Sequence, residues 1–275
     1  MAIKDILVAL SPRDEEDKAR DFALSMAAQS GGQVTGIVYA LEHLTSFSLY
    51  PEFTSELRQR HGKEATKAAE LARARFVEAA GKAGVRHEFH SATVTAHAAT
   101  TDFAQRLRTA DLAILTQHQP GNVESVGDLF AEAALFHSGR PMIIVPQDHI
   151  GDFSVGRVLI AWDSGIQAAR AVAAAMPLLR NATEIEVLTV NEESKGSDLR
   201  GNELVRHLRL HDLVSELRTR EDHDIPEAII REAKLFRASL VIMGGYGHSR
   251  LREFVFGGAT RRMLREMPVP VFMAH

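Results

Sequence analysis

The sequence predicts an α/β protein in which one fold, a parallel sheet with helices on both faces, occurs twice in tandem. Short apolar runs alternate with longer helical stretches along the 275 residues, and parallel sheets with helical crossovers produce this alternation. The pattern starts again in the second half, where residues 158–162 repeat the apolar run at 6–10. Likewise, the run at 240–243 repeats the run at 112–115. Such a long internal repeat indicates two similar domains.

In the first half, apolar runs of strand length are separated by stretches with helical periodicity or composition. The predicted strands are residues 3–10, 34–41, 85–94, 112–116 and 142–145. The predicted helices are residues 14–29, 55–83, 97–109 and 127–138. We therefore expect two domains, at residues 1–147 and 156–275, joined by a short connection.

The composition is that of an ordinary globular protein, with 45% apolar and 25% charged residues. A net charge of −4 gives no broad basic surface for nucleic acid, and no apolar run approaches the roughly 20 residues that span a membrane. The chain enters its first strand without a signal-peptide pattern, and the absence of cysteine excludes disulfides and thiol catalysis. We expect a cytoplasmic protein without nucleic-acid or membrane partners.

The stretch most informative about function follows the apolar run at 240–243, which has the length of a buried strand. This run leads into a set of glycines and one hydroxyl residue, namely Gly244, Gly245, Gly247, Gly257, Gly258 and Thr260. Glycine permits positive φ or a close approach of the backbone to a ligand. Because a helix-like segment begins beyond these glycines, free N–H groups at its start would favour an anion, and a phosphate is the expected occupant.

The spacing of Gly244, Gly247 and Gly257, written G-x-x-G-x9-G, resembles the nucleotide-binding signature of the universal stress protein family. The resemblance covers both halves and implies two Rossmann-like domains, each with the strand order 3-2-1-4-5. In that family these glycines surround the phosphates and ribose of ATP. Gly258 stands where the family usually has Ser or Thr, whereas Thr260 keeps the second hydroxyl position.

The resemblance also implies which residues of the second half would surround an adenine nucleotide, either ATP with Mg²⁺ or AMP or ADP. Asp163 matches a carboxylate that lies near the nucleoside, and the backbone of Val190 would bind the adenine edge. The other predicted contacts are Ala161, Ser164, Met243, Gly244, Gly247, His248, Gly257, Gly258, Ala259 and Thr260. Thr260 could also serve as a plain helix cap.

The first half resembles a degenerate copy of the same site. Side chains stand opposite the glycines of the motif: Thr116, Gln119, Asp128 and Leu129. Ser11 stands opposite Asp163, so the carboxylate near the nucleoside is missing as well. We therefore expect the ligand in the second half only.

The predicted role is nucleotide-dependent binding or signalling in a stress response, and two alternatives stay open. A slow ATPase is one, although no G-x-x-x-x-G-K-[ST] or G-x-S-x-G motif occurs and no catalytic base is evident. A structural module with an empty site is the other. His207 and His211 have i, i+4 spacing, but no third ligand accompanies them, so no metal site is expected.

In the implied strand order, the fifth strand of each half, at 142–145 and 271–274, is an edge strand. An unpaired apolar edge invites association. We therefore expect the two halves to pair through these strands as an intramolecular pseudo-dimer. A homodimer of the whole chain is a further assembly that the resemblance allows.

Overall fold

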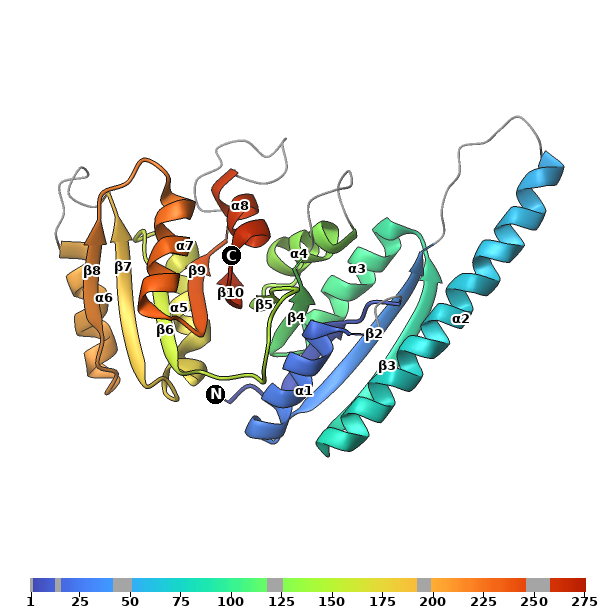
Figure 1. Cartoon of the computed structure of the whole chain (residues 1–275), viewed down its shortest axis with the longest axis horizontal. Coiled ribbons are helices and arrows are strands. Elements are labelled where there is room, and N and C mark those ends of the chain that lie inside the picture. The colour runs from blue at the N-terminus through green and yellow to red at the C-terminus, as the bar shows by residue number, and fades with distance from the viewer. Residues whose placement is uncertain (1, 13–15, 42–50, 118–125, 192–198, 246–257) are drawn as a thin grey trace.

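The computed structural model describes residues 2–12, 16–41, 51–117, 126–191, 199–245 and 258–275. In this part of the chain, ten strands form one continuous sheet (Figure 1). The strands are β1 (Asp5–Ala9), β2 (Gln33–Leu41), β3 (Arg86–Val94), β4 (Leu112–Thr116), β5 (Met142–Val145), β6 (Arg157–Ala161), β7 (Glu184–Val190), β8 (Glu216–Arg220), β9 (Leu240–Gly244) and β10 (Val271–Ala274). The helices are α1 (Lys18–Ser30), α2 (Pro51–Ala83), α3 (Ala96–Leu107), α4 (Val126–His137), α5 (Ile166–Leu179), α6 (Leu199–Leu210), α7 (Ile225–Phe236) and α8 (Gly258–Glu266).

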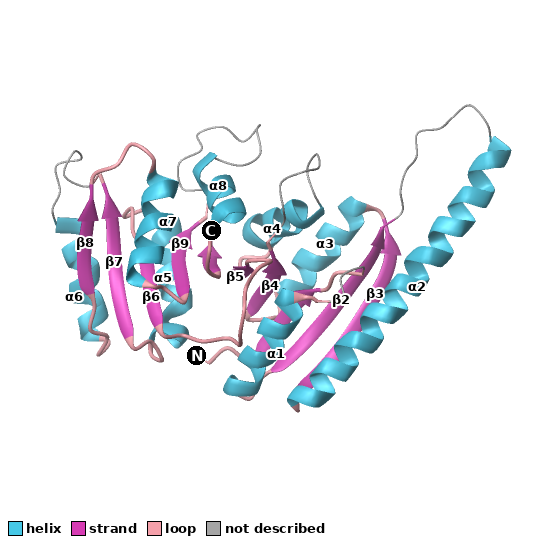
Figure 2. Ribbon diagram, in the orientation of Figure 1, coloured by secondary structure: helices cyan, strands magenta, loops and turns pink. Residues whose placement is uncertain are grey.

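The helices cover both faces of the sheet, as Figure 2 shows. Buried side chains of α1, α2, α5 and α6 pack into one apolar core, and those of α3, α4, α7 and α8 pack into another on the opposite face. Each core contains residues of both halves. A central parallel strand must therefore be apolar on both sides, which explains why β1, β4, β6 and β9 read as continuous apolar runs.

The strand order confirms the predicted topology, because β3-β2-β1-β4-β5 in the first half is matched by β8-β7-β6-β9-β10 in the second. Within each half the neighbouring strands are parallel. Predicted strand and helix positions agree with the structure to within a few residues. The largest shifts are at the starts of two helices: α1 begins at Lys18 rather than at residue 14, and α2 begins at Pro51 rather than at residue 55 and extends beyond the sheet in Figure 1.

The two halves are joined by antiparallel pairing of β5 with β10, as expected from their position at the sheet edges. Met142 pairs with Met273, Ile143 with Phe272, and Ile144 with Val271. All of these side chains are buried, so the seam is apolar on both faces of the sheet.

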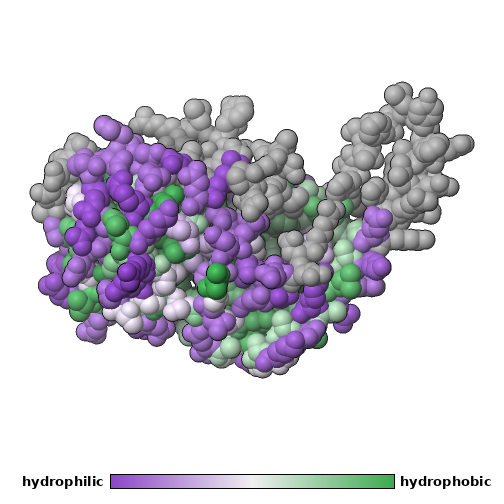
Figure 3. Space-filling model, viewed as in Figure 1, coloured by the Kyte–Doolittle hydropathy of each residue, from purple (hydrophilic) through white to green (hydrophobic). Residues whose placement is uncertain are grey.

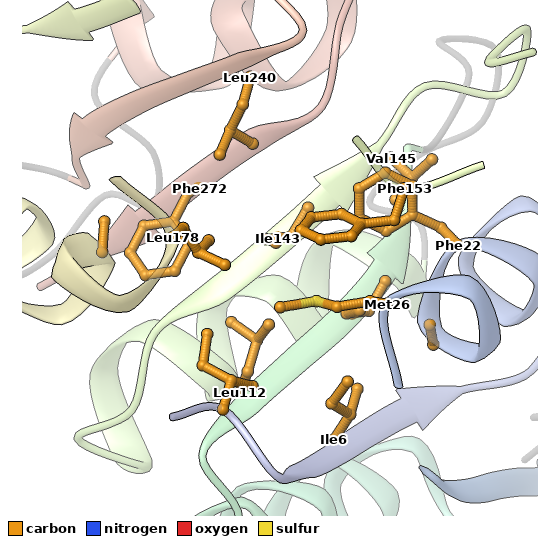
Figure 4. Close-up of a cluster of buried hydrophobic side chains, with 14 of the residues drawn as sticks. Ile6, Phe22, Met26, Leu112, Ile143, Val145, Phe153, Leu178, Leu240 and Phe272 are labelled. Atoms are coloured by element: carbon orange, nitrogen blue, oxygen red, sulfur yellow. The ribbon is translucent and has the colours of Figure 1, made fainter. Parts of the chain in front are cut away.

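The apolar core on the α1 and α5 face crosses this seam. Figure 4 shows Phe272 and Leu178 of the second half in one cluster with Ile143 and Phe22 of the first half. Because the same side chains contact both halves, folding of one half is stabilised by the other.

The connection between the halves is itself packed on the first half. The backbone N–H of Phe153 donates to Ser25 Oγ at 3.1 Å, and Gln29 Nε2 donates to the Phe153 carbonyl at 2.7 Å. The Phe153 ring meets the Phe22 ring edge-on, with 5.3 Å between centroids. The connection is therefore fixed on α1 before the chain enters the second half.

On the face shown in Figure 3, hydrophilic side chains cover most of the second half, and apolar ones lie in small separate groups. Leu235 and Leu210 are among the exposed apolar side chains of the second half, and single exposed apolar residues are normal on protein surfaces. No helix in the described ranges is long and apolar enough to cross a membrane.

We predict that Phe272→Ala lowers the free energy of unfolding by about 3–5 kcal/mol, because Phe272 is fully buried at the seam. The chain should still unfold in one transition, and urea denaturation followed by circular dichroism and tryptophan fluorescence should give the same midpoint. Leu235→Ala, at a residue that is 67% exposed, is the control and should change stability by less than about 0.5 kcal/mol. Two separate transitions in the native chain would contradict a shared core.

Candidate functional site

The candidate site lies in the second half, at the carboxyl ends of β6, β7 and β9. This is the topological switch point of the sheet, because β7 and β8 follow β6 on one side while β9 and β10 lie on its other side. β6 is flanked by β9 on one side and β7 on the other, and open α/β sheets bind ligands at such a switch point. Ala161 at the end of β6 pairs with Met243 near the end of β9. Val190 ends β7. Three residues predicted from different parts of the sequence are therefore brought to one edge of the sheet.

The turn after β6 places a carboxylate at this edge. Asp163 is exposed, and its Oδ1 accepts a hydrogen bond from the Gly165 backbone N–H at 2.8 Å. Ser164 between them has φ of 64°, which is uncommon for a residue other than glycine. Helix α5 then begins, with Gly165 at its N-cap and no side-chain hydrogen bond to the cap. The carboxylate is thus held by its own turn next to a helix start.

Gly244 at the end of β9 is required by packing rather than by an unusual φ. A Cβ at this position would lie 2.5 Å from the Ala168 backbone nitrogen and 2.8 Å from the Gln167 carbonyl carbon. Its φ is not positive. The sequence suggested positive φ or a close approach to a ligand. The structure shows no positive φ and a close approach to the first turn of α5, and the approach to a ligand stays a prediction. The strand end and the α5 start are therefore in backbone contact.

Gly245 packs against helix α4 of the first half. A Cβ there would lie 3.1 Å from Leu135 Cδ1 of α4, so the start of the glycine segment touches the first half. Its N–H donates to the Ala274 carbonyl at 2.9 Å, and its own carbonyl accepts from His275 Nδ1 at 2.9 Å. The His275 ring in turn meets the Phe136 ring, with centroids 4.6 Å apart.

In the first half, side chains occupy the corresponding place. Thr116, which stands opposite Gly244, accepts a hydrogen bond from the Ala19 N–H at 3.2 Å through its Oγ1. Asp17 caps α1, accepting from the Arg20 N–H at 3.0 Å and from the Ser11 N–H at 2.8 Å. Burial raises the pKa of the Asp17 carboxyl. Backbone N–H groups at the start of α1, those of Ala19 and Arg20, therefore have hydrogen-bond partners within the protein.

Helix α8 carries the last part of the predicted site. It begins at Gly258 and includes Ala259 and Thr260 in its first turn. Thr260 is buried and lies inside the helix, so the interpretation of this residue as the N-terminal cap is not supported. The predicted contacts Gly247, His248 and Gly257 lie outside the described residues.

Features of two residues in this region were not predicted from the sequence. Trp162, the only tryptophan of the chain, precedes Asp163, and its buried Nε1 has no hydrogen-bond partner among the described residues. Asn191 follows Val190 with φ of 58° and binds Asp222. The sequence signal that could have indicated the latter contact is the Asp-x-Asp before Ile225, which is typical of a helix start.

The histidine pair considered as a metal site lies elsewhere, on α6. The His207 and His211 rings are in edge contact, with centroids 4.8 Å apart. In the part of the chain that the structure describes, no three histidine, aspartate or glutamate side chains lie close enough together to hold a metal ion.

The family model of the universal stress protein family matches residues 2–146 and again residues 155–275. The chain belongs to the universal stress protein family. The two matches agree with the repeated fold, and the predicted family is thereby confirmed. A search of the curated proteins found no match.

Solved structures of similar fold cover nearly the whole chain. A universal stress protein from Archaeoglobus fulgidus DSM 4304 is 17% identical, with a TM-score of 0.73 over 98% of this chain and 97% of that chain. A structure from Pseudomonas aeruginosa UCBPP-PA14 is 15% identical, with a TM-score of 0.61 over 98% and 92%. At these identities the similarity shows the fold, which here includes both universal stress protein domains in one chain.

We predict that Gly244→Ala destabilises this universal stress protein by about 1–3 kcal/mol, since the new methyl group would collide with α5 backbone atoms that cannot rotate away. Gly156→Ala is the matched control, because a Cβ there would lie 3.7 Å from Ser239 Oγ, an ordinary contact. Urea denaturation of both variants measures the difference. Equal stability of Gly244→Ala and the native chain would show that β9 and α5 are not in close contact.

Proposed function

We propose that the second half of this universal stress protein binds an adenine nucleotide and that the chain acts as a nucleotide-dependent binding or signalling module in a stress response. The observation that carries the proposal is the contrast between the two switch points. Thr116 and Asp17 fill the place in the first half with hydrogen-bonded side chains. The second half has Gly244 and Gly165 at the matching strand end and helix cap.

The residues at this edge suit the separate parts of a nucleotide. The exposed Asp163 carboxylate can accept hydrogen bonds from ribose hydroxyls. Val190, with its backbone at the end of β7, is the proposed contact for the adenine edge. At the start of α8, the backbone N–H groups of Gly258 and Ala259 have no carbonyl partner within the helix, and such groups commonly bind phosphate oxygens.

ATP with Mg²⁺ is the ligand we propose first, with AMP or ADP as the shorter forms. Mg²⁺ keeps most of its water and is commonly held through substrate phosphates, so it does not require a dedicated cluster of protein ligands. The remaining proposed contacts are Ala161, Ser164, Met243, Gly244, Gly247, His248, Gly257 and Thr260.

We further propose that the domains span residues 1–147 and 156–275 and that the first serves mainly in packing. Its support is the seam: β5 supplies the partner strand for β10, and α4 supplies Leu135 against Gly245. Loss of the first-half site would leave these contacts intact.

ATP with Mg²⁺ should raise the melting temperature of the protein. A ligand that binds only the folded state adds RT ln(1 + [L]/Kd), which is about 2.7 kcal/mol at a hundredfold excess over Kd. Tripolyphosphate with Mg²⁺ at the same concentrations is the control for ionic effects and should have little effect. No shift at millimolar ATP would favour the structural module, and single-turnover hydrolysis in the same samples would reveal a slow ATPase.

Asp163→Asn should weaken ATP binding about tenfold, because the amide keeps the turn contact with Gly165 but loses the charged acceptor. Ser11→Ala, the corresponding change in the first half, should leave the affinity nearly unchanged. Quenching of Trp162 fluorescence offers a direct readout beside the site. Loss of binding in Ser11→Ala with normal binding in Asp163→Asn would contradict the proposal and place the site in the first half.

A further inference from the structure

The turn between β8 and α7, residues 221–224, is bonded to the strand end that we propose for the adenine. Asn191 follows Val190 directly, and its side-chain amide exchanges two hydrogen bonds with the Asp222 backbone. Asn191 Nδ2 donates to the Asp222 carbonyl at 2.6 Å, and the Asp222 N–H donates to Asn191 Oδ1 at 2.8 Å. The end of β7 therefore has a fixed position relative to this turn.

The turn itself is rigid. Asp222 Oδ1 accepts from the Asp224 N–H at 2.9 Å, and this bond, together with Arg231 at 2.8 Å from Oδ2, lowers the pKa of Asp222. Asp224 is the N-cap of α7, with Oδ1 accepting from the Glu227 N–H at 3.1 Å. Both aspartates thus hold the turn in one conformation.

Arg262 of α8 forms ion pairs with this turn and with the start of α7. Arg262 Nη1 pairs with Asp224, Nη2 with Glu227 at 3.1 Å, and Nε with Glu266 on α8 at 2.8 Å. The hydrogen bonds to Glu266 and Asp224 raise the pKa of Arg262. All three guanidinium nitrogens thus have carboxylate partners, and these contacts hold the Arg262 side chain between α8 and the start of α7.

We propose that Arg262 is a positioning residue that holds the N-terminus of α8 toward the phosphates of the bound nucleotide and so favours ATP over adenosine. Arg262 lies one turn after Gly258, and the attraction between a helix start and an anion acts mainly over the first turn. A small rotation of α8 would therefore weaken phosphate contacts while leaving the base and ribose contacts in place. This inference rests on the proposed function.

Two substitutions that remove charges of opposite sign distinguish a positioning role of Arg262 from a direct electrostatic effect on the phosphates. Arg262→Met removes a positive charge, and Asp224→Asn removes a negative charge while asparagine still caps α7. If only the field at the phosphates mattered, Arg262→Met would weaken ATP binding and Asp224→Asn would strengthen it. If Arg262 positions α8, both substitutions break the same contact and both weaken ATP binding.

The test is titration calorimetry of the full chain with ATP and Mg²⁺, and separately with adenosine. We expect Arg262→Met and Asp224→Asn each to weaken ATP binding about five- to tenfold and adenosine binding less than about twofold. Arg265→Met, which removes the same charge from the same helix but takes no part in these contacts, should change ATP binding less than about twofold. Circular dichroism checks that each variant is folded, and Glu227→Gln replaces any variant that is not.

Tighter ATP binding by Asp224→Asn, or equal losses for ATP and adenosine, would overturn the positioning role. Unchanged ATP binding in both variants would also overturn the positioning role. The proposed function would still stand in that case, provided that the native chain binds ATP. A native chain that binds neither ATP nor adenosine would contradict the proposed function itself.

Discussion

The antiparallel pairing of β5 with β10 is the contact on which the rest of this structure depends. It converts two sheets with apolar edges into one sheet of ten strands and allows each apolar core to extend across both halves. A single universal stress protein domain would expose β5 or β10 as an unpaired apolar strand, which invites association with other chains. The connection that leads into the second half packs on α1 through Phe153.

The two halves differ at their switch points, although one seam joins them. The seam is formed by β5, β10 and the buried residues around Phe272, and Gln117, directly after β4, adds a hydrogen bond from its Nε2 to the Met267 carbonyl at 3.5 Å. In the first half, Thr116 and Asp17 accept hydrogen bonds from backbone N–H groups of α1 at this point. In the second half, Gly244 allows the end of β9 to pack directly against the backbone of α5. One fold, used twice, supplies a packing partner and a candidate site.

Much of the fold could be predicted because it depends on apolar periodicity. The positions of β4 and β5 followed from short buried runs and from the repeat, whereas the strand order and the seam followed from the resemblance to the universal stress protein family. The reason for Gly244 could not be predicted, since contact with Ala168 of α5 depends on how a helix and a strand pack in three dimensions. Periodicity carries no such information.

The same limit applies within the candidate site. The resemblance to the family named Ala161, Val190 and Met243, and these residues lie at the carboxyl ends of β6, β7 and β9. The partners of Arg262 are Asp224, Glu227 and Glu266. Two of those partners lie more than thirty residues away in the chain, and no spacing rule connects them.

A crystal structure of the full chain grown with ATP and Mg²⁺ would test the central claim most directly. We expect one nucleotide per chain, with its base beside Val190, its ribose near Asp163 and its phosphates at the start of α8. The switch point between β1 and β4 should hold only its own side chains. Nucleotide density at that first-half switch point, with none beside Asp163, would contradict the account.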